Sequence, residues 1–238
     1  MSTRDAIVKG LIRRRYARHA TMPERGWGGR GRALRAGYSA DQLDVLRPNV
    51  VEAWAGCGNV IAGVDAGAAQ VIVDLGAGSG LDARLLRELA GPGAQVLAID
   101  LTPEMLAIEI GAEAGITRIA GDMEQLPLGD AVCDLVIANA SFNLALHPDR
   151  AFAEAWRILK PGGRLHICEL VRDGELPAEM LADPLGWSTS LGGVLKEPEL
   201  AGVIGSAGFS DVRVTGHRPF EPVMAVRITA NKPAAATH

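Results

Sequence analysis

A glycine-rich turn at residues 76–80 directly follows a short apolar run at 71–75, Val-Ile-Val-Asp-Leu. Four apolar residues around one acid predict a short buried strand, and residues 81–89 have the composition of a helix. A strand that opens through glycines into a helix brings bare backbone N–H groups and the positive helix end close to a ligand. The spacing is Gly-x-Gly-x-Gly, and Leu81 stands where a nicotinamide-binding fingerprint would have its third glycine. The turn therefore predicts a ligand site that is not a nicotinamide site, and a tight turn that binds nothing is the alternative.

Two further acids follow later apolar runs at positions suited to a nucleoside. Asp100 ends the run 95–100, twenty residues after Gly80, and a carboxylate there can accept both hydroxyls of a ribose. Asp122 ends a third run, and it could accept from the amino group of an adenine while Met123 or Leu101 packs on the ring. Thr102 and Pro103 between them predict a helix start, with an N-cap followed by proline at the first helical position.

Strands and helices are expected to alternate from residue 71 to residue 171. A fourth strand at 133–139 ends in Asn139, and a fifth follows the Pro-Gly-Gly turn at 161–163. This alternation predicts an α/β fold with a parallel sheet built of crossover units. Ligands of open parallel sheets bind outside the carboxyl ends of the strands. Asp74, Asp100, Asp122 and Asn139 should therefore meet at one edge of the sheet.

The rest of the chain is expected to decorate this core, which we place at residues 61–171. Residues 1–60 predict an N-terminal helical arm and cap, with an amphipathic helix at 3–20 whose apolar side includes Ile7 and Ile12. Residues 172–196 are too long for an ordinary connection and predict an insertion that acts as a lid on the substrate side. Residues 197–238 predict a helix and two strands that complete the sheet.

Composition narrows the class of protein. The 238 residues are 48% hydrophobic and 22% charged, as in an ordinary globular domain, and the net charge is −4. Residues 1–36 carry ten Lys or Arg against two acids. Such an arm can attract nucleic acid, but we favour docking of a basic helix on the acidic body.

The sequence also bears on the location of the protein. No apolar run approaches the roughly 20 residues that span a bilayer, no secretory signal is visible, and the three cysteines form no paired framework. These features predict a cytoplasmic protein with no membrane partner. No metal site is expected, and the sequence does not indicate the oligomeric state.

The motifs occur in the order typical of class I methyltransferases that use S-adenosylmethionine. From about Ala36 to Phe209 the chain resembles the arsenite methyltransferases in particular, most specifically at Gly-Cys-Gly-Asn 56–59 and Asp-Pro-Leu-Gly-Trp 183–187. The resemblance implies a Rossmann-like sheet of seven strands, mostly parallel with the last antiparallel, and S-adenosylmethionine as cofactor. The candidate cofactor-binding residues are Asp74, Gly76, Ala77, Gly78, Gly80, Asp100, Leu101, Met105, Asp122, Met123 and Asn139.

The same resemblance implies that trivalent arsenic would be bound by cysteine thiolates from separate segments. Cys57 fills one such position, but Ala140 and Ser190 stand at two others, the latter shortly after Trp187. The candidate substrate-side residues are therefore Cys57, Ala140, Trp187 and Ser190. A soft centre needs two or three thiolates, so we expect a small-molecule acceptor other than arsenite. A metalloid or chalcogen (arsenite, selenium or tellurium) methyltransferase that uses Cys57 is one alternative. A non-catalytic module that binds S-adenosylmethionine is the other.

The candidate catalytic residues are Cys57, Asn139 and His147. Cys57 can instead be a small residue of a glycine turn, and His147 an exposed loop histidine. His166 alternates within the fifth strand and is expected to pack there, while Glu169 is expected to end that strand, facing either the site or solvent. Methyl transfer from a sulfonium needs mainly proximity, alignment and exclusion of water, which would explain why no catalytic triad is visible.

Overall fold

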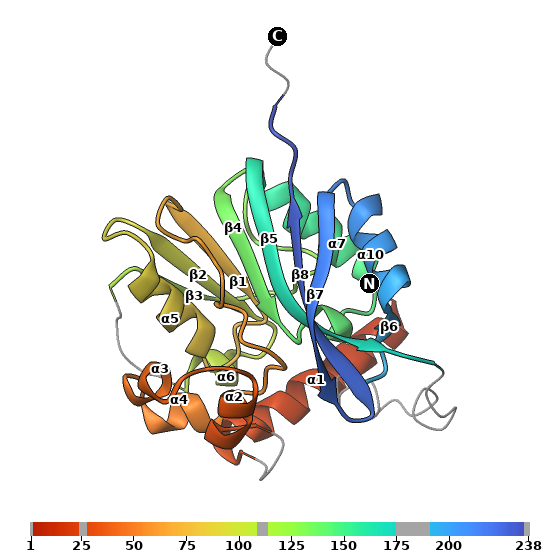
Figure 1. Cartoon of the computed structure of the whole chain (residues 1–238). Coiled ribbons are helices and arrows are strands. Elements are labelled where there is room, and N and C mark those ends of the chain that lie inside the picture. Colours follow the sequence, from red (N-terminus) through yellow and green to blue (C-terminus); the bar gives the residue numbers. More distant parts are fainter. Residues whose placement is uncertain (1, 24–27, 109–113, 175–190, 236–238) are drawn as a thin grey trace.

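The computed structural model describes residues 2–23, 28–108, 114–174 and 191–235, and it contains one twisted sheet with helices on both faces (Figure 1). The strand order is β3-β2-β1-β4-β5-β8-β7, with β6 paired to β5 off this path. The strands are β1 (Val71–Leu75), β2 (Gln95–Asp100), β3 (Ile116–Ala120), β4 (Cys133–Asn139), β5 (Leu159–Arg172), β6 (Leu195–Lys196), β7 (Ser210–Phe220) and β8 (Val223–Asn231). Only β8 runs antiparallel to its neighbours, β5 and β7, so the predicted fold class is confirmed.

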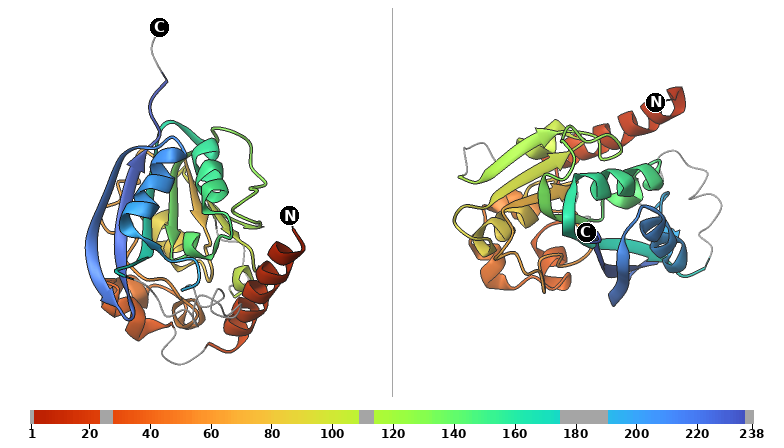
Figure 2. Two further views of the ribbon diagram at one scale, coloured as in Figure 1. Left: turned by 90° about the vertical axis from the view of Figure 1, so that its right-hand side faces the viewer. Right: turned by 90° about the horizontal axis from the view of Figure 1, so that it is seen from above.

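Helices cover both faces and one end of the sheet. They are α1 (Thr3–Thr21), α2 (Arg30–Arg35), α3 (Ala40–Asp44), α4 (Pro48–Glu52), α5 (Leu81–Leu89), α6 (Pro103–Leu106), the 3-10 turn η1 (Phe142–Leu144), α7 (Pro148–Ile158) and α10 (Glu197–Ser206). In Figure 1, α1 to α4 gather with α6 below the sheet, and Figure 2 shows α7 and α10 together on one face. Among the described residues, no helix has both the length and the apolar character to cross a bilayer.

Alternation along the central strands builds the two halves of the core. Ile72 and Leu135 belong to the cluster shared with α3, α4 and α5, whereas their neighbours Val73 and Val136 belong to the cluster shared with α7 and α10. All four side chains are at most 2% exposed. Since successive side chains of a strand point to opposite faces, a strand buried on both faces must be apolar at nearly every position. The central strands therefore form a rigid platform, and polar groups at their ends are held firmly.

Within the predicted arm and cap, the short helices α2 and α4 begin at Arg30 and Pro48. Proline suits the first turn of α4, where its missing N–H leaves no bond unmade. The insertion predicted at 172–196 overlaps the sheet at both ends, since β5 extends to Arg172 and the final two residues form β6. Most of the predicted lid, residues 175–190, lies outside the described ranges.

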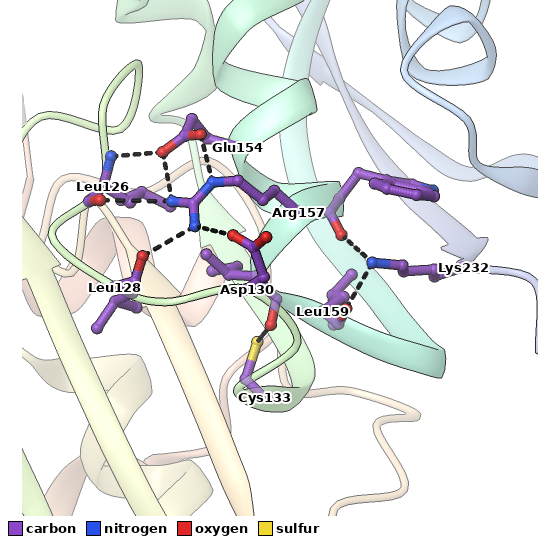
Figure 3. A network of polar contacts seen from close by, with 10 residues as sticks. Leu126, Leu128, Asp130, Cys133, Glu154, Arg157, Leu159 and Lys232 are labelled. Atoms are coloured by element: carbon purple, nitrogen blue, oxygen red, sulfur yellow. Dashed lines mark hydrogen bonds and ion pairs between the residues drawn. The ribbon is translucent and has the colours of Figure 1, made fainter. Parts of the chain in front are cut away.

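The connection between β3 and β4 is fastened to α7 by Arg157 (Figure 3). Its guanidinium donates to the Leu128 carbonyl oxygen at 2.9 Å, to Asp130 Oδ1 at 2.7 Å and to Glu154 Oε1 at 2.6 Å. Glu154 Oε2 in turn accepts the backbone N–H of Leu126 at 2.7 Å. Five donors in a fixed plane suit Arg to such a clamp. The clamp holds the chain just beyond residues 121–124, which directly follow the carboxyl end of β3.

Candidate functional site

A cavity opens at the carboxyl ends of β1, β2 and β4, where the glycine turn, the end of β2 and α1 meet. Nine of the eleven predicted cofactor-binding residues line it: Gly76, Ala77, Gly78, Asp100, Leu101, Met105, Asp122, Met123 and Asn139. Asp74 and Gly80 are not part of the described lining. Asp74 is buried within β1, and Gly80 is the left-handed N-cap of α5. The structure thus brings together nearly all of the polar groups expected at this edge.

The turn after β1 is possible only with glycine. Gly76 has φ +72°, and a Cβ at this position would lie 2.3 Å from the Cβ of Ser141. Gly78 and Gly80 also have positive φ, +54° and +83°, a region that is costly for residues with side chains. The N–H groups of Gly76 and Ala77 both donate to the carbonyl oxygen of Ile99, at 2.8 and 3.0 Å. The turn is therefore pulled against the end of β2, next to Asp100.

Asp100 is anchored by backbone on both of its oxygens. Gly78 N–H donates to Oδ2 at 2.8 Å, and Thr102 N–H donates to Oδ1 at 2.7 Å. Burial raises the pKa of this carboxyl above its usual value, and the two backbone donors oppose that shift. Each carboxylate oxygen can accept a further hydrogen bond, and the residue lines the cavity. Asp100 can therefore hold a diol such as that of a ribose.

Asn139 joins the end of β4 to the turn at 56–59. Its Oδ1 accepts the N–H groups of Cys57 and Gly58 at 2.9 and 3.3 Å, and its Nδ2 donates to the Gly58 carbonyl oxygen at 2.8 Å. The same Nδ2 donates to Asp82 Oδ2 at 3.0 Å. A Cβ on Gly56 would lie 2.6 Å from Asn139 Cγ, so the turn needs glycine to approach this closely. Asn139 is thus fully engaged in positioning the turn.

Asp82, which sequence reasoning did not single out, carries a buried carboxyl in the cavity wall. The hydroxyl of Tyr38 donates to Oδ1, and Trp54 Nε1 approaches Oδ2 at 3.4 Å. Burial also raises the pKa of Asp74 well above its usual range, and the charges of Asp82 and Asp100 raise it further. Asp74 Oδ2 has no hydrogen-bond partner among the described residues. Of these carboxyls, those of Asp82 and Asp100 line the cavity and can accept hydrogen bonds from a ligand on this side.

Helix α1 supplies part of the cavity lining through Lys9, Ile12 and Tyr16. Lys9 Nζ lies 2.6 Å from Asp122 Oδ2 and 2.8 Å from Glu124 Oε2. The basic helix is therefore docked on acidic residues, as expected. Asp122, the predicted acceptor for an adenine amino group, is bound to Lys9 here. The prediction that Ile7 belongs to the packed apolar side of α1 was wrong, because its side chain is 57% exposed.

Cys57 lies in the wall of a second cavity of about 530 Å³, and Ala140 lines both cavities. Burial raises the pKa of the Cys57 thiol well above its usual value, and the neighbouring Cys168 and Glu169 add to the shift. The thiol is therefore protonated near neutral pH. A Cβ on Gly58 would lie 2.6 Å from Cys168 Sγ, so a second thiol adjoins the same turn. Trp187 and Ser190, the other two substrate-side candidates, lie outside the described residues.

The remaining titratable candidates lie away from the first cavity. His147 is the N-cap of α7, and its Nε2 lies 3.4 Å from Asp5 Oδ2 of α1; it is not among the described lining residues. Burial and the charges of Arg227 and Arg164 lower the pKa of His166 to about 4, which agrees with the expected packing role.

Glu169 does not end the fifth strand, so that expectation was wrong: β5 continues to Arg172. The side chain is 1% exposed, and its Oε1 accepts the N–H groups of Ser141 and Phe142 at 2.9 and 2.8 Å. Burial raises the pKa of Glu169 to about 7. The residue therefore fixes the loop after β4 rather than facing a ligand or solvent.

Comparisons with known proteins bear on the same region. Residues 73–167 match the model of the methyltransferase domain family. Arsenite methyltransferase from Halobacterium salinarum is 31% identical over 185 residues, which cover 76% of this chain and 47% of that protein. Demethylmenaquinone methyltransferase from Thermobifida fusca is 36% identical over 139 residues, which cover 56% of each. The chain spans about half the length of these curated relatives.

Among solved structures, the chain is similar to an arsenic(III) S-adenosylmethionine methyltransferase from Chlamydomonas reinhardtii. The TM-score is 0.65 at 27% sequence identity, and the match covers 85% of this chain and 72% of that chain. The predicted resemblance is thus confirmed for the domain and its fold.

Proposed function

We propose that this chain, whose residues 73–167 form a methyltransferase domain, transfers the methyl group of S-adenosylmethionine to a small-molecule acceptor. The observation that carries the proposal is the cavity at the carboxyl ends of the strands, where nine of the predicted cofactor-binding residues converge. Asp100 is the central element, because both of its oxygens are fixed by backbone and remain able to accept further bonds.

The cavity residues suit each part of this cofactor. Asp100 would accept the ribose hydroxyls, while Leu101 and Met123 would enclose the adenine and Asp122 would accept from its amino group. Because Lys9 now binds Asp122, its ammonium group would share that carboxylate or move aside. The buried carboxyl of Asp82 would face the positively charged part of the ligand. When bound, the cofactor supplies a methyl carbon attached to a sulfonium, which is a good leaving group.

The protein's own contribution to such a transfer is alignment and exclusion of water. A lone pair of the acceptor forms the bond to the methyl carbon as the carbon–sulfur bond breaks. Any proton of the acceptor atom is lost to bulk solvent, before the acceptor is enclosed or after the product is released. Helix α1 shields the cavity, and Asn139 fixes the turn that separates it from the second cavity. Of the candidate catalytic groups, Cys57 is a buried protonated thiol and His147 lies beside Asp5. Proximity of the two reactants therefore supplies most of the rate enhancement.

We propose that the acceptor is not arsenite, although several relatives are named arsenite methyltransferase. Ala140 has a methyl group where a thiol would be needed beside Cys57, and a soft centre is held by two or three thiolates. The raised pKa of Cys57 also disfavours arsenite binding, because only the thiolate is an effective ligand.

The test is the formation of S-adenosylhomocysteine from S-adenosylmethionine and a panel of small thiols, phenols, amines and carboxylates, measured by chromatography. Turnover of at least one acceptor is the expected result, with a lower rate in Asp100→Asn at a cofactor concentration near the wild-type dissociation constant. Tight cofactor binding with no product from any acceptor would instead identify a non-catalytic binding module. Turnover of arsenite at a rate comparable to the best organic acceptor would overturn the exclusion of arsenite.

A further inference from the structure

The second cavity, on the far side of Ala55 and Ala140 from the cofactor cavity, is rich in arginine. Among its described lining residues are Arg15, Arg32, Arg35 and Arg218, against the single acid Glu221. These arginines come from three separate elements: α1 and α2 near the N-terminus, and β7 near the other end of the chain. The fold therefore collects positive charge around one concave surface of about 530 Å³.

This cavity adjoins the place where the methyl group would be presented. Ala55 and Ala140 line both cavities, so the two spaces share a wall of small side chains. A nucleophile must come within about 3–3.5 Å of the carbon it attacks. A molecule that enters the second cavity can thus approach the shared wall with one end while its other end lies among the arginines.

Arg32 is held rigidly at the inner side of this cavity. Its Nε donates to the Gly56 carbonyl oxygen at 2.9 Å, and its guanidinium carbon lies 4.5 Å from the centre of the Phe220 ring. Burial lowers the pKa of Arg32, and the charge of Arg35 contributes in the same direction. Carbonyl and ring contacts orient a guanidinium but leave its positive charge in place. Arg32 is therefore a fixed cation in a partly desolvated position.

Arg218 and Arg35 add two more cations beside it. Arg218 donates to the carbonyl oxygens of Arg35 and Cys57 at 2.8 and 3.3 Å. Neither Arg35 nor Arg218 forms an ion pair with an acid in the part of the chain that the structure describes. Holding like charges together costs free energy unless an anion joins them, and guanidinium groups match the oxygens of carboxylate and phosphate.

We propose that the methyl acceptor carries an oxyanion, a carboxylate or phosphoryl group, which Arg32, Arg35 and Arg218 bind in the second cavity. The proposal rests on the proposed methyl transfer and specifies its substrate class. Binding of the anionic end would direct the opposite, nucleophilic end of the acceptor toward Ala55 and Ala140. The acceptor is thus selected by its charge at one end and by a nucleophilic atom that reaches the shared wall at the other.

The test is a calorimetric titration of inorganic phosphate into the protein saturated with S-adenosylhomocysteine, at low ionic strength. We expect one phosphate site per chain, with affinity reduced at least about tenfold in Arg35→Met and in Arg218→Met, the size expected for the loss of one charge-assisted bond. Arg213→Met is the matched control, because Arg213 is exposed on the same strand β7 and does not line the cavity. Its affinity for phosphate should equal that of the wild type.

The variants Arg35→Met and Arg218→Met together separate the loss of an anion contact from a loss of folding. Arg218→Met removes bonds to two carbonyl oxygens and can disturb folding, whereas the Arg35 side chain makes no hydrogen bond to a described residue. The absence of phosphate binding to the wild type, or binding unchanged in both arginine variants, would overturn the proposal. Titration with S-adenosylhomocysteine alone is performed first: if it fails while phosphate still binds through Arg35, the proposed methyl transfer is wrong and the anion site stands.

Discussion

Replacement of Asp100 by asparagine should weaken cofactor binding with little change in shape. In the structure each carboxylate oxygen accepts one backbone N–H, from Gly78 at 2.8 Å and from Thr102 at 2.7 Å. The amide of asparagine keeps one accepting oxygen, places an NH2 group against the other donor, and removes the negative charge. The ribose would then lose at least one hydrogen bond to a charged acceptor, worth about 1.5–3 kcal/mol. The dissociation constant for S-adenosylhomocysteine should rise about 10- to 150-fold in a calorimetric titration.

A matched control separates loss of a ligand contact from general loosening. Asp134, at the start of β4, also accepts two backbone N–H groups, from Gln70 and Val71, both at 2.9 Å. It lies at the opposite end of the strand from Asn139. Asp134→Asn should lower the free energy of unfolding while leaving cofactor affinity unchanged. Equal affinity in Asp100→Asn and the wild type, or equal weakening in both variants, would refute the assignment of the ribose to Asp100.

Three further changes test other parts of the structure. Glu169→Gln should gain roughly 2–4 kcal/mol of unfolding free energy relative to the wild type as pH rises from 4.5 to about 7. The wild type loses stability over this range because the pKa of Glu169 is higher in the folded than in the unfolded state, so that ionisation favours unfolding. Denaturant titrations at several pH values measure this, and a difference independent of pH would contradict it. Ala140→Cys should increase arsenite affinity by adding a further thiol beside the cavity wall that holds Cys57, and equal arsenite binding by both proteins in a filter assay would count against that geometry. Neutralising the exposed residues Arg13 and Arg14 should leave turnover unchanged, whereas a strongly salt-dependent affinity for RNA, lost in that variant, would show that the arm binds nucleic acid.

The sequence predicted the sheet and its ligand edge because both depend on local signals. Apolar runs such as 71–75 and 133–139 match the observed strands, and the glycine turn and Thr102-Pro103 mark the start of a helix at the expected residues. Asp100 follows from spacing alone, since a carboxylate that ends the second strand of a parallel sheet must lie beside the first turn.

Contacts between distant segments were not predictable in the same way. Lys9 and Asp122 are separated by 113 residues, and Arg218 reaches a carbonyl oxygen 161 residues away. Short helices such as α2 and α4 carry too few residues for a periodic pattern, and their position depends on packing against the sheet. Asp82 had one local signal, an acid in the first turn of a helix, but its buried role depends on Tyr38, which lies 44 residues earlier.

A crystal structure of the chain with S-adenosylhomocysteine is the most direct test of the central claim. The proposed function predicts that the ribose hydroxyls lie on the carboxylate of Asp100, with the adenine between Leu101 and Met123. The sulfur should face the wall formed by Ala55 and Ala140. A ligand bound in another part of the molecule, or with its adenine at that wall, would contradict the assignment of this cavity to a methyl donor.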